Sequence, residues 1–112
     1  MDENADTPVE STGDELLEMI RALSNPQRLR IIAGLAGGRN YVSQLARDLQ
    51  MSRPLLHLHL QKLEAAGLVK SELELSEDGK AMRFFEVVPF AVQLTPGVIA
   101  IAEATLSYKE EA

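Results

Sequence analysis

The sequence has no cysteine, and this absence excludes disulfides, thiolate metal sites and thiol-based redox sensing. It also has no apolar run that approaches the roughly 18 residues of a membrane-spanning helix. The N-terminus is acidic and lacks the basic and then apolar segments of a signal peptide. With 112 residues, 46% of them apolar and only 4% aromatic, the chain suits one small domain with a modest core. We therefore expect a cytoplasmic protein without a membrane partner.

The groups that an enzyme needs are also scarce. No nucleophile, base and orienting group stand together in the sequence, and no glycine-rich loop of the phosphate-binding type occurs. The two histidines, His57 and His59, are two positions apart, so on a helix they point to different faces and cannot chelate one ion. We predict that the protein is not an enzyme and that it holds no metal and no cofactor.

The net charge of −6 is unusual for a protein that binds nucleic acid, but the charge is unevenly distributed. Residues 26–70 carry seven basic and two acidic side chains, a net charge of +5, whereas the rest of the chain carries four basic and 15 acidic ones. The basic charge therefore lies in the middle of the chain, and the acidic charge lies toward both ends.

Residues 52–66 predict the helix around which the chain is organised. Ser52 is a good N-cap, and Pro54 falls in the first turn, where its missing N–H costs nothing. At 100° per residue the helix has a core arc and an opposite free arc. The core arc contains Leu56, His59, Leu60 and Leu63, and the free arc contains Arg53, Pro54, His57, Leu58 and Gln61.

A shorter helix is predicted before it, over residues 42–50, with Ser43 as its cap. The tight turn at Gln50 and Met51 leaves room only for two helices that cross at a large angle, which is typical of a helix-turn-helix. After the second helix, Gly67 is suited to end it in the left-handed conformation.

The following segment predicts a β-hairpin, or wing. Residues 68–75 alternate with period 2, Asp78-Gly79 is a turn signal, and residues 81–88 are rich in strand-forming side chains. Lys80 and Arg83 are candidates for contact with DNA, but four neighbouring acids (Glu72, Glu74, Glu77 and Asp78) repel phosphate. Either the wing stands away from DNA or only Lys80 at its tip touches it.

The ends of the chain complete the expected organisation. Residues 1–12 form an acidic tail too polar to fold, residues 13–94 form the winged domain, and residues 95–112 form a C-terminal helix that opens at Thr95-Pro96. A helix over residues 14–23 and another from Pro26 precede the helix-turn-helix, and the latter is expected to turn Leu29, Ile32, Ala33 and Leu35 inward while Arg28 and Arg30 point elsewhere.

The apolar arc of the C-terminal helix covers about half of its circumference, which is wider than the stripe of about 100° that docks a helix on its own domain. The remaining apolar surface is most simply covered by the same helix of a second subunit. The helix over residues 14–23 is expected to lie beside it in that interface. The expected dimer interface consists of Leu16, Leu17, Ile20, Leu23, Val98, Ile99, Ile101, Ala102, Thr105 and Leu106. The alternative is a self-contained hydrophobic core.

Two stretches resemble the arsenical-repressor (ArsR) family of winged helix-turn-helix regulators. They are ALSNPQRLRIIAGLAGG, residues 22–38, and YVSQLARDLQMSRPLLHLHLQKLEAAGLV, residues 41–69. The resemblance implies a mainly α fold with a small β-hairpin wing, and a dimeric DNA-binding regulator whose terminal helices form the dimer interface. It does not extend to the family's metal sites, because residues 41–44 hold no cysteine and the last helix holds no histidine.

Several exposed side chains are candidates for contact with double-stranded DNA. Arg53 is suited to guanine or to phosphate, Gln61 to adenine, and Leu58 to a thymine methyl group, unless it is an ordinary exposed leucine. His57 lies beside Arg53, Leu55 lies on the flank and is expected to be half in the core, and His59 is expected to be interior. The full set is Ser52, Arg53, Pro54, Leu55, His57, Leu58, Gln61, Lys62, Arg39, Arg47, Lys80 and Arg83.

We therefore predict a homodimeric transcriptional regulator that binds a palindromic operator, with repression as the favoured mode of action. Neither charge nor spacing distinguishes a repressor from an activator, and no residue identifies a small-molecule effector. The alternative is a winged helix used as a protein-protein interaction module, which the acidic wing and the pI near 4.9 favour.

Overall fold

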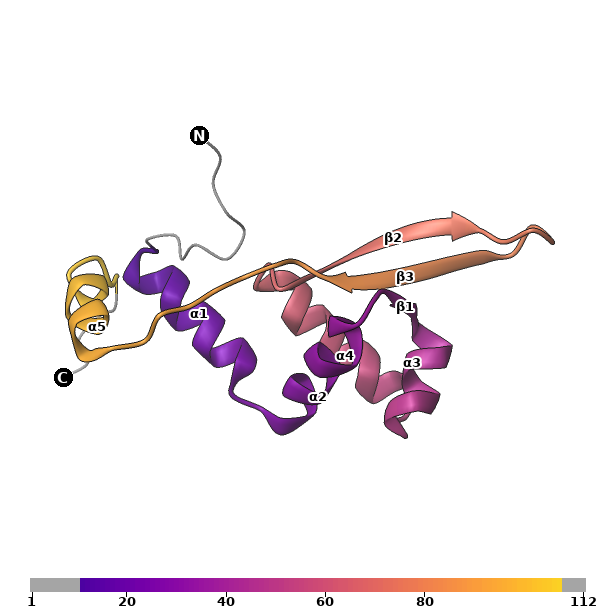
Figure 1. Ribbon diagram of the computed structural model, residues 1–112, viewed down its shortest axis with the longest axis horizontal. Helices are drawn as coiled ribbons and strands as arrows, with labels where there is room; N and C mark the ends of the chain where they lie inside the picture. The colour runs from indigo at the N-terminus through magenta and orange to yellow at the C-terminus, as the bar shows by residue number, and fades with distance from the viewer. Residues whose placement is uncertain (1–10, 108–112) are drawn as a thin grey trace. The chain divides into compact units, whose positions relative to one another are not determined.

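The computed structural model describes residues 11–107 (Figure 1). In chain order the elements are α1 (Gly13–Leu23), α2 (Pro26–Ala36), β1 (Asn40–Tyr41), α3 (Val42–Leu49), α4 (Arg53–Ala65), β2 (Val69–Leu75), β3 (Ala81–Val87) and α5 (Pro96–Glu103). They divide into two compact units. We call Ala22–Val88 the winged unit, and the described residues on either side of it, 11–21 and 89–107, the terminal unit. The winged unit is the expected winged helix-turn-helix.

Three of the predicted helix starts are confirmed, each with a side-chain cap and a proline in the first turn. The side chain of Asn25 accepts hydrogen bonds from two backbone N–H groups of α2. Ser52 Oγ accepts from the backbone N–H of Leu55 at 3.3 Å, and Thr95 Oγ1 accepts from that of Val98 at 3.1 Å. These caps satisfy amides that the first helical turn leaves unpaired, so short local signals define where α2, α4 and α5 begin.

Helix α2 buries a different stripe from the expected one. Leu29 is 52% exposed, Ala33 is exposed and Ile32 is half-buried, whereas Ile31 and Leu35 are 0% and 2% exposed. Ile31 and Leu35 are one turn apart and share a face, while Leu29 is about 200° away from Ile31 around the helix axis. Both stripes are apolar, so the prediction for Leu29, Ile32 and Ala33 was wrong because periodicity alone does not choose between them.

The turn of the helix-turn-helix differs in detail from the prediction. Ser43 is not the cap of α3, because the N-cap position belongs to Tyr41, whose side chain makes no capping bond. Gln50 lies outside the helix in the left-handed conformation, with φ of 53°, and the N–H of Met51 donates to the carbonyl of Ala46 at 2.9 Å. The chain thereby turns between α3 and α4 over residues 50–52, one residue more than the sequence predicted.

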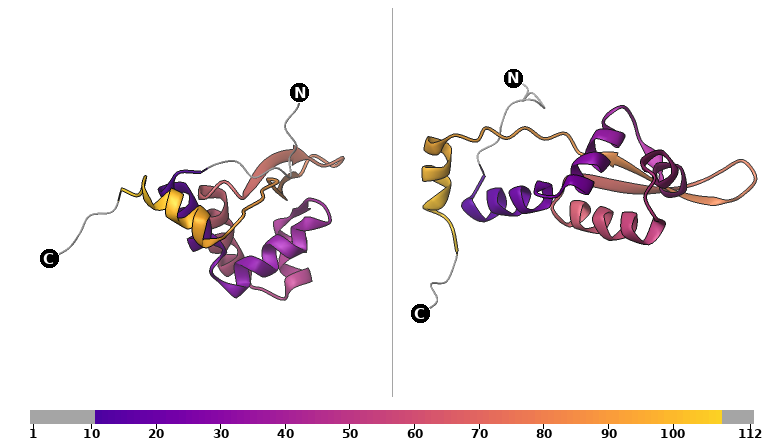
Figure 2. Two further views of the ribbon diagram at one scale, coloured as in Figure 1. Left: turned by 60° about the vertical axis from the view of Figure 1, so that its left-hand side comes forward. Right: turned by 90° about the horizontal axis from the view of Figure 1, so that it is seen from below.

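The wing is a three-stranded antiparallel sheet in the order β1-β3-β2. The hairpin of β2 and β3 was predicted, but β1, in which Asn40 pairs with Phe85, was not. At the hairpin turn Gly79 has a φ of 85°, and the N–H of Ser76 donates to the carbonyl of Lys80 at 2.7 Å. The hairpin extends well beyond β1, and α2, α3 and α4 lie on one side of the sheet (Figures 1 and 2).

The core of the winged unit lies between these helices and the inner face of the sheet. It consists of the largest fully buried side chains together with Phe85, which is 5% exposed. They are Ile31, Leu35, Leu45, Leu56, Leu60, Leu63, Leu68, Val69 and Phe85. The expected core arc of α4 is therefore confirmed, and it holds the helix by one face while the opposite face is free.

The terminal unit begins with a capping box that the sequence analysis missed. Thr12 Oγ1 accepts from the backbone N–H of Glu15, and the carboxylate of Glu15 accepts from the backbone N–H of Thr12, both at 3.1 Å. Spacing of this kind, Thr-x-x-Glu, is a known helix-start signal. Helix α1 accordingly starts at Gly13, and residues 1–10 of the expected tail lie outside the described residues.

Helix α5 and the residues after it hold the start of α1 (Figure 2). The N–H of Gly13 donates to Thr105 Oγ1 at 2.6 Å, and Ser107 bonds to the carboxylate of Asp14 through its N–H and its hydroxyl. A Cβ on Gly13 would overlap the carbonyl oxygen of Ala102. Glycine at this position therefore permits the close approach of α1 to the end of α5.

Helix α5 is shorter than expected, because it ends at Glu103 with Ala104 as its C-cap. Thr105 Oγ1 donates to the carbonyl of Ala102 at 3.0 Å while it accepts from Gly13, and these bonds accompany the exit from the helix. Tyr108, which we expected on the helix, lies outside the described residues. The connector over residues 88–95 contains no strand.

Candidate nucleic-acid interface

The free face of α4 is as exposed as the sequence predicted. Arg53, His57, Leu58 and Gln61 are all exposed, and Leu58 retains 48% of its surface. Leu55 is 37% exposed, which agrees with its expected position on the flank, half in the core. Because buried leucines pack the opposite face into the core, they fix which side of α4 faces the solvent.

His59 is the buried polar residue of the core, at 7% exposure, as the helical spacing predicted. Arg28 Nη1 lies 3.2 Å from His59 Nδ1, and Arg28 Nε donates to the carbonyl oxygen of Ala22 at 2.6 Å. Burial, followed by the positive charges of Arg28 and Lys62, lowers the pKa of His59. The expectation that Arg28 points away from the core was wrong, since its guanidinium turns inward to α4.

The other basic candidates are divided between two places. Lys62 is exposed on α4, and Arg47 is exposed on α3, where its guanidinium donates to Gln44 Oε1 at 2.6 Å. Both remain on the helix-turn-helix surface. Arg30, which we had not listed among the candidates, donates to the carbonyl oxygen of Leu49 at 2.6 Å and ties α2 to the end of α3.

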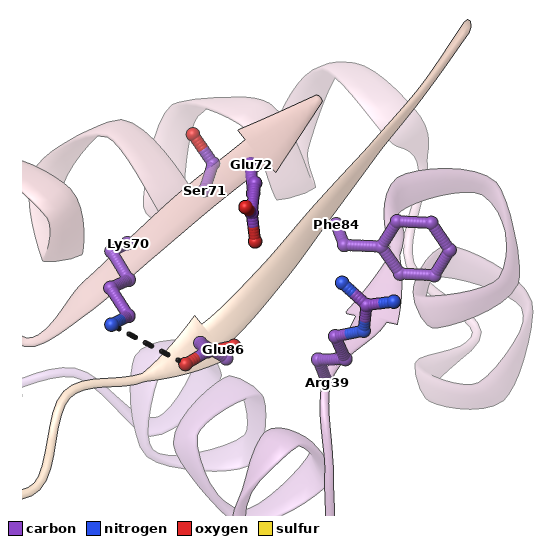
Figure 3. A pocket seen from close by; sticks show the side chains of 6 residues that line it. All are labelled: Arg39, Lys70, Ser71, Glu72, Phe84 and Glu86. Carbon is purple, nitrogen blue, oxygen red and sulfur yellow. Dashed lines mark ion pairs between the residues drawn. The ribbon is translucent and has the colours of Figure 1, made fainter. Parts of the chain in front are cut away.

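Arg39 is instead bound to the wing. Its guanidinium makes two hydrogen bonds to the Glu74 carboxylate, at 2.6 and 3.0 Å. It also lies 4.2 Å from the centre of the Phe84 ring (Figure 3). Hydrogen bonding to Arg39 lowers the pKa of the Glu74 carboxyl. A fork of two bonds and a cation over an aromatic ring is a geometry that arginine favours. The sequence could not show this pairing, because 35 positions separate the two charged residues.

The outer face of the wing collects its acids. In the β2–β3 register Lys70 pairs with Glu86, Glu72 with Phe84, and Glu74 with Met82, so these side chains alternate onto one face. Four of them, Lys70, Glu72, Phe84 and Glu86, line a shallow hollow of about 280 Å³ together with Arg39 and Ser71 (Figure 3). Lys70 forms an ion pair with Glu86 at 3.5 Å.

The inner face of the wing carries a different set of side chains. Leu73 pairs with Arg83 and Leu75 with Ala81, and the two leucines are 57% and 75% exposed. Arg83 Nη1 donates to Ser71 Oγ at 3.0 Å, and Ser71 Oγ donates to the carboxylate of Glu64 on α4 at 3.3 Å. Arg83 therefore lies on the side of the wing that faces α4, away from Glu72 and Glu74. With the correct strand register, period-2 alternation in the sequence would have predicted that Arg83 lies on the opposite face of the wing from Glu72 and Glu74.

Within residues 11–107, no group of three or more side chains of the types His, Cys, Asp and Glu is arranged to hold a metal ion. Over the same range, no helix is both long and apolar enough to cross a bilayer.

Comparison with known sequences identifies the family. Residues 25–71 match the family model described as "Bacterial regulatory protein, arsR family". An uncharacterized HTH-type transcriptional regulator of Methanocaldococcus jannaschii is 36% identical over 85 residues, which cover 76% of this chain and 88% of that protein. The chain belongs to the ArsR family. The HTH-type transcriptional repressor SmtB of Mycobacterium tuberculosis is 38% identical over 55 residues, covering 49% of this chain and 41% of the relative.

Solved structures share the ArsR-family fold with this chain. HlyU from Vibrio cholerae matches with a TM-score of 0.61 at 24% identity, over 86% of this chain and 92% of that one. The homodimeric winged helix-turn-helix DNA-binding domain of a Mycobacterium bovis protein matches with a TM-score of 0.60 at 23% identity, over 81% and 74%. The chain is a DNA-binding transcriptional regulator and not an enzyme, and homodimerisation is typical of its family.

The predicted dimer residues of this ArsR-family chain have three kinds of surroundings. Ala102, at 6% exposure, and Thr105 contact the start of α1 within the chain. Leu16, Leu23, Val98 and Leu106 are half-buried. The most exposed of the set are Leu17 at 37%, Ile20 at 38%, Ile99 at 48% and Ile101 at 64%.

Proposed function

We propose that this regulator is a repressor that binds a palindromic operator as a homodimer, with α4 as the recognition helix. The observation that carries the proposal is the free face of α4, which is polar and exposed on a helix anchored by its opposite face. The description of the Mycobacterium tuberculosis relative as a transcriptional repressor supports the mode of action.

The N-terminal half of α4 enters the major groove in this proposal, because that end carries the positive end of the helix dipole. Arg53 forms a two-bond fork with guanine or holds a phosphate, and Gln61 pairs with adenine. Leu58 meets a thymine methyl group, which explains a leucine that keeps 48% of its surface exposed. Ser52, Pro54, Leu55 and His57 complete the surface, and Lys62 and Arg47 neutralise phosphates.

The wing approaches DNA with its inner face. Arg83 lies on that face and is connected through Ser71 to Glu64 of α4, so it continues the surface of the recognition helix. Lys80 is exposed at the tip. The acids Glu72 and Glu74 lie on the outer face and turn their charge away from the phosphates. We therefore assign Arg39 to support of the wing and not to contact with DNA.

Dimerisation uses the terminal unit. Burial of an exposed isoleucine or leucine stabilises an interface by about 1.5–3 kcal/mol if it becomes complete, and the exposed Leu17, Ile20, Ile99 and Ile101 form the proposed centre. A two-fold axis would place two copies of α4 about 34 Å apart, one turn of DNA. In domain terms, residues 13–94 bind DNA and residues 95–112 contribute to the dimer. The proposed setting is the cytoplasm.

The second candidate function, a protein-protein interaction module, is favoured by one observation. The outer face of the wing gathers Glu72, Glu74 and Glu86 around two cations that are already paired. A basic partner segment could meet this face without competing with DNA for α4. Failure of the DNA experiment below would make this the better proposal.

The test is selection of DNA fragments from the source genome by the purified protein at two salt concentrations, followed by sequencing. We expect enrichment of a palindromic site and a steep loss of affinity as salt rises. Arg53→Ala should weaken binding to that site at least about tenfold, since a good base contact contributes roughly 1–3 kcal/mol. Binding that is weak and equal for all sequences would contradict the proposal.

A matched pair of variants tests the orientation of the wing. Arg83→Ala should lower the slope of log affinity against log salt by about two, as expected for one lost phosphate contact in each protomer of the dimer. Lys70→Ala removes the same charge from the outer face and should leave the slope unchanged. Equal effects of the two variants would show that the faces of the wing are not distinguished by DNA.

A further inference from the structure

The core of the winged unit contains one feature that the proposed DNA contacts do not use. His59 lies on the buried face of the recognition helix, one turn from the fully buried Leu56 and Leu63. Its ring meets the guanidinium of Arg28, which comes from α2. Among the described residues, His59 is the polar side chain that the core buries.

The chemistry of the pair determines the protonation state of the histidine. Arginine has only N–H donors and stays charged at any ordinary pH, so His59 Nδ1 must accept at the 3.2 Å contact. The imidazole is then neutral, with its proton on Nε2. A protonated imidazole would present a second donor and a second positive charge to Arg28, and the contact would be lost.

Arg28 has a second partner, and it belongs to a third helix. Its Nε donates to the carbonyl oxygen of Ala22 at 2.6 Å, in the last turn of α1. The final carbonyls of a helix have no partner within it, and an arginine can satisfy one of them. The guanidinium thus joins the end of α1, the start of α2 and the buried face of α4.

We propose that Arg28 and His59 are positioning residues, which hold the recognition helix in its DNA-binding orientation against α2 and the end of α1 only while His59 is neutral. This inference rests on the proposed role of α4 in DNA binding. Neither residue touches DNA. Uptake of a proton by His59 releases Arg28 and weakens operator binding, so affinity falls as the solution becomes acidic.

The charges around the ring support the sign of this effect. Arg28 from α2 and Lys62 from α4 itself act on His59, and both disfavour a protonated ring. Together with burial they place its pKa below the ordinary value of a histidine. The contact is therefore fully formed near neutral pH and is lost as the pH falls through the lowered pKa.

The test uses the fact that the chain has only two histidines. In a His57→Gln background, His59 is the only imidazole left. Because His57 lies on the proposed DNA-binding surface, the operator affinity of His57→Gln near neutral pH is the reference for the other variants. Operator affinity is measured from about pH 8 to about pH 5, the range in which histidines titrate. We expect the dissociation constant of the dimer to rise by up to about tenfold per pH unit for each of its two copies of His59 once the pH is below the pKa of that residue.

The matched variant adds His59→Asn, whose side-chain oxygen occupies the same place along the side chain as Nδ1 and accepts from Arg28 but does not titrate. It should bind the operator near neutral pH and lose the acidic decline. Arg28→Met should bind more weakly throughout and lose the decline as well. Circular dichroism verifies that each variant is folded. Equal pH profiles for His57→Gln alone and with His59→Asn would overturn the proposal.

A titration of the free protein by proton NMR separates failure of this inference from failure of the proposed function. We expect the pKa of His59 to lie below the ordinary value of a histidine and to rise in Arg28→Met, because a positive neighbour is removed. If the protein bound no operator at all, the proposed function would fall with the positioning role. If it bound, but the pKa of His59 were unchanged in Arg28→Met, only the positioning role would fall.

Discussion

Helices α4 and α5 both begin at a Ser or Thr cap followed by a proline, and both are rich in aliphatic residues. Their aliphatic side chains nevertheless differ in burial. In α4, Leu60 and Leu63 are 1% and 0% exposed. In α5, Ile99 and Ile101 are 48% and 64% exposed, and Ala102 is the buried residue. One helix completes its burial within a single chain, and the other does not.

The difference separates two sources of stability. The leucines of α4 stabilise the winged unit itself, because they are removed from water whenever the chain folds. The isoleucines of α5 contribute little until another surface covers them, so their contribution depends on protein concentration. Substitutions of buried residues in α4 should therefore lower the free energy of unfolding, whereas substitutions in α5 should mainly raise the dimer dissociation constant.

The largest effect is expected at the centre of α4. Leu60→Ala should lower the free energy of unfolding by about 2–5 kcal/mol, because it leaves a cavity in a packed core. Urea denaturation measures this loss. The control, Ile101→Ala, should leave the stability of the dilute protein nearly unchanged, and a loss as large as that of Leu60→Ala would remove the contrast between the helices.

The next effect concerns assembly. Ile101→Glu should raise the dimer dissociation constant by roughly tenfold to a hundredfold, since the burial lost is worth about 1.5–3 kcal/mol. Sedimentation at several protein concentrations measures it. Leu75→Glu changes a leucine that is 75% exposed on the wing and should leave the dimer intact. Dimers of equal strength in both variants would show that α5 is not the interface.

A smaller effect is expected from the cap of α4. Ser52→Ala removes the hydroxyl that accepts from the N–H of Leu55 and should cost about 0.5–2 kcal/mol of stability. Thr95→Ala removes the equivalent bond from α5. We expect the first loss to appear in denaturation at any protein concentration and the second to appear mainly in the strength of the dimer.

The smallest effect on stability should come from the free face of α4. Leu58→Ala should change the free energy of unfolding by less than about 0.5 kcal/mol, because the side chain is largely in water. If Leu58 meets a thymine methyl group, operator affinity should fall about fivefold, which corresponds to about 1 kcal/mol. A normal operator affinity would make Leu58 an ordinary exposed leucine.

The site shows how far spacing alone could be taken. The free and buried arcs of α4 follow from helical periodicity, and Arg53, His57, Leu58 and Gln61 lie where it places them. Arg39 could not be assigned in the same way, because its partner Glu74 lies on another strand. The two-faced wing was also missed, since the opposed charges separate only when the strand register is known.

Local sequence determined the starts of α2, α4 and α5, the hairpin turn and the buried arc of α4, because each depends on hydrogen bonds or periodicity within a few neighbouring residues. Tertiary structure decided which of two apolar stripes α2 buries, how β1 joins the sheet, where α5 ends and how Arg28 reaches His59. Each of those outcomes depends on packing or hydrogen bonding with residues that are distant in the sequence. The residue pattern within one element does not indicate which other element it will contact.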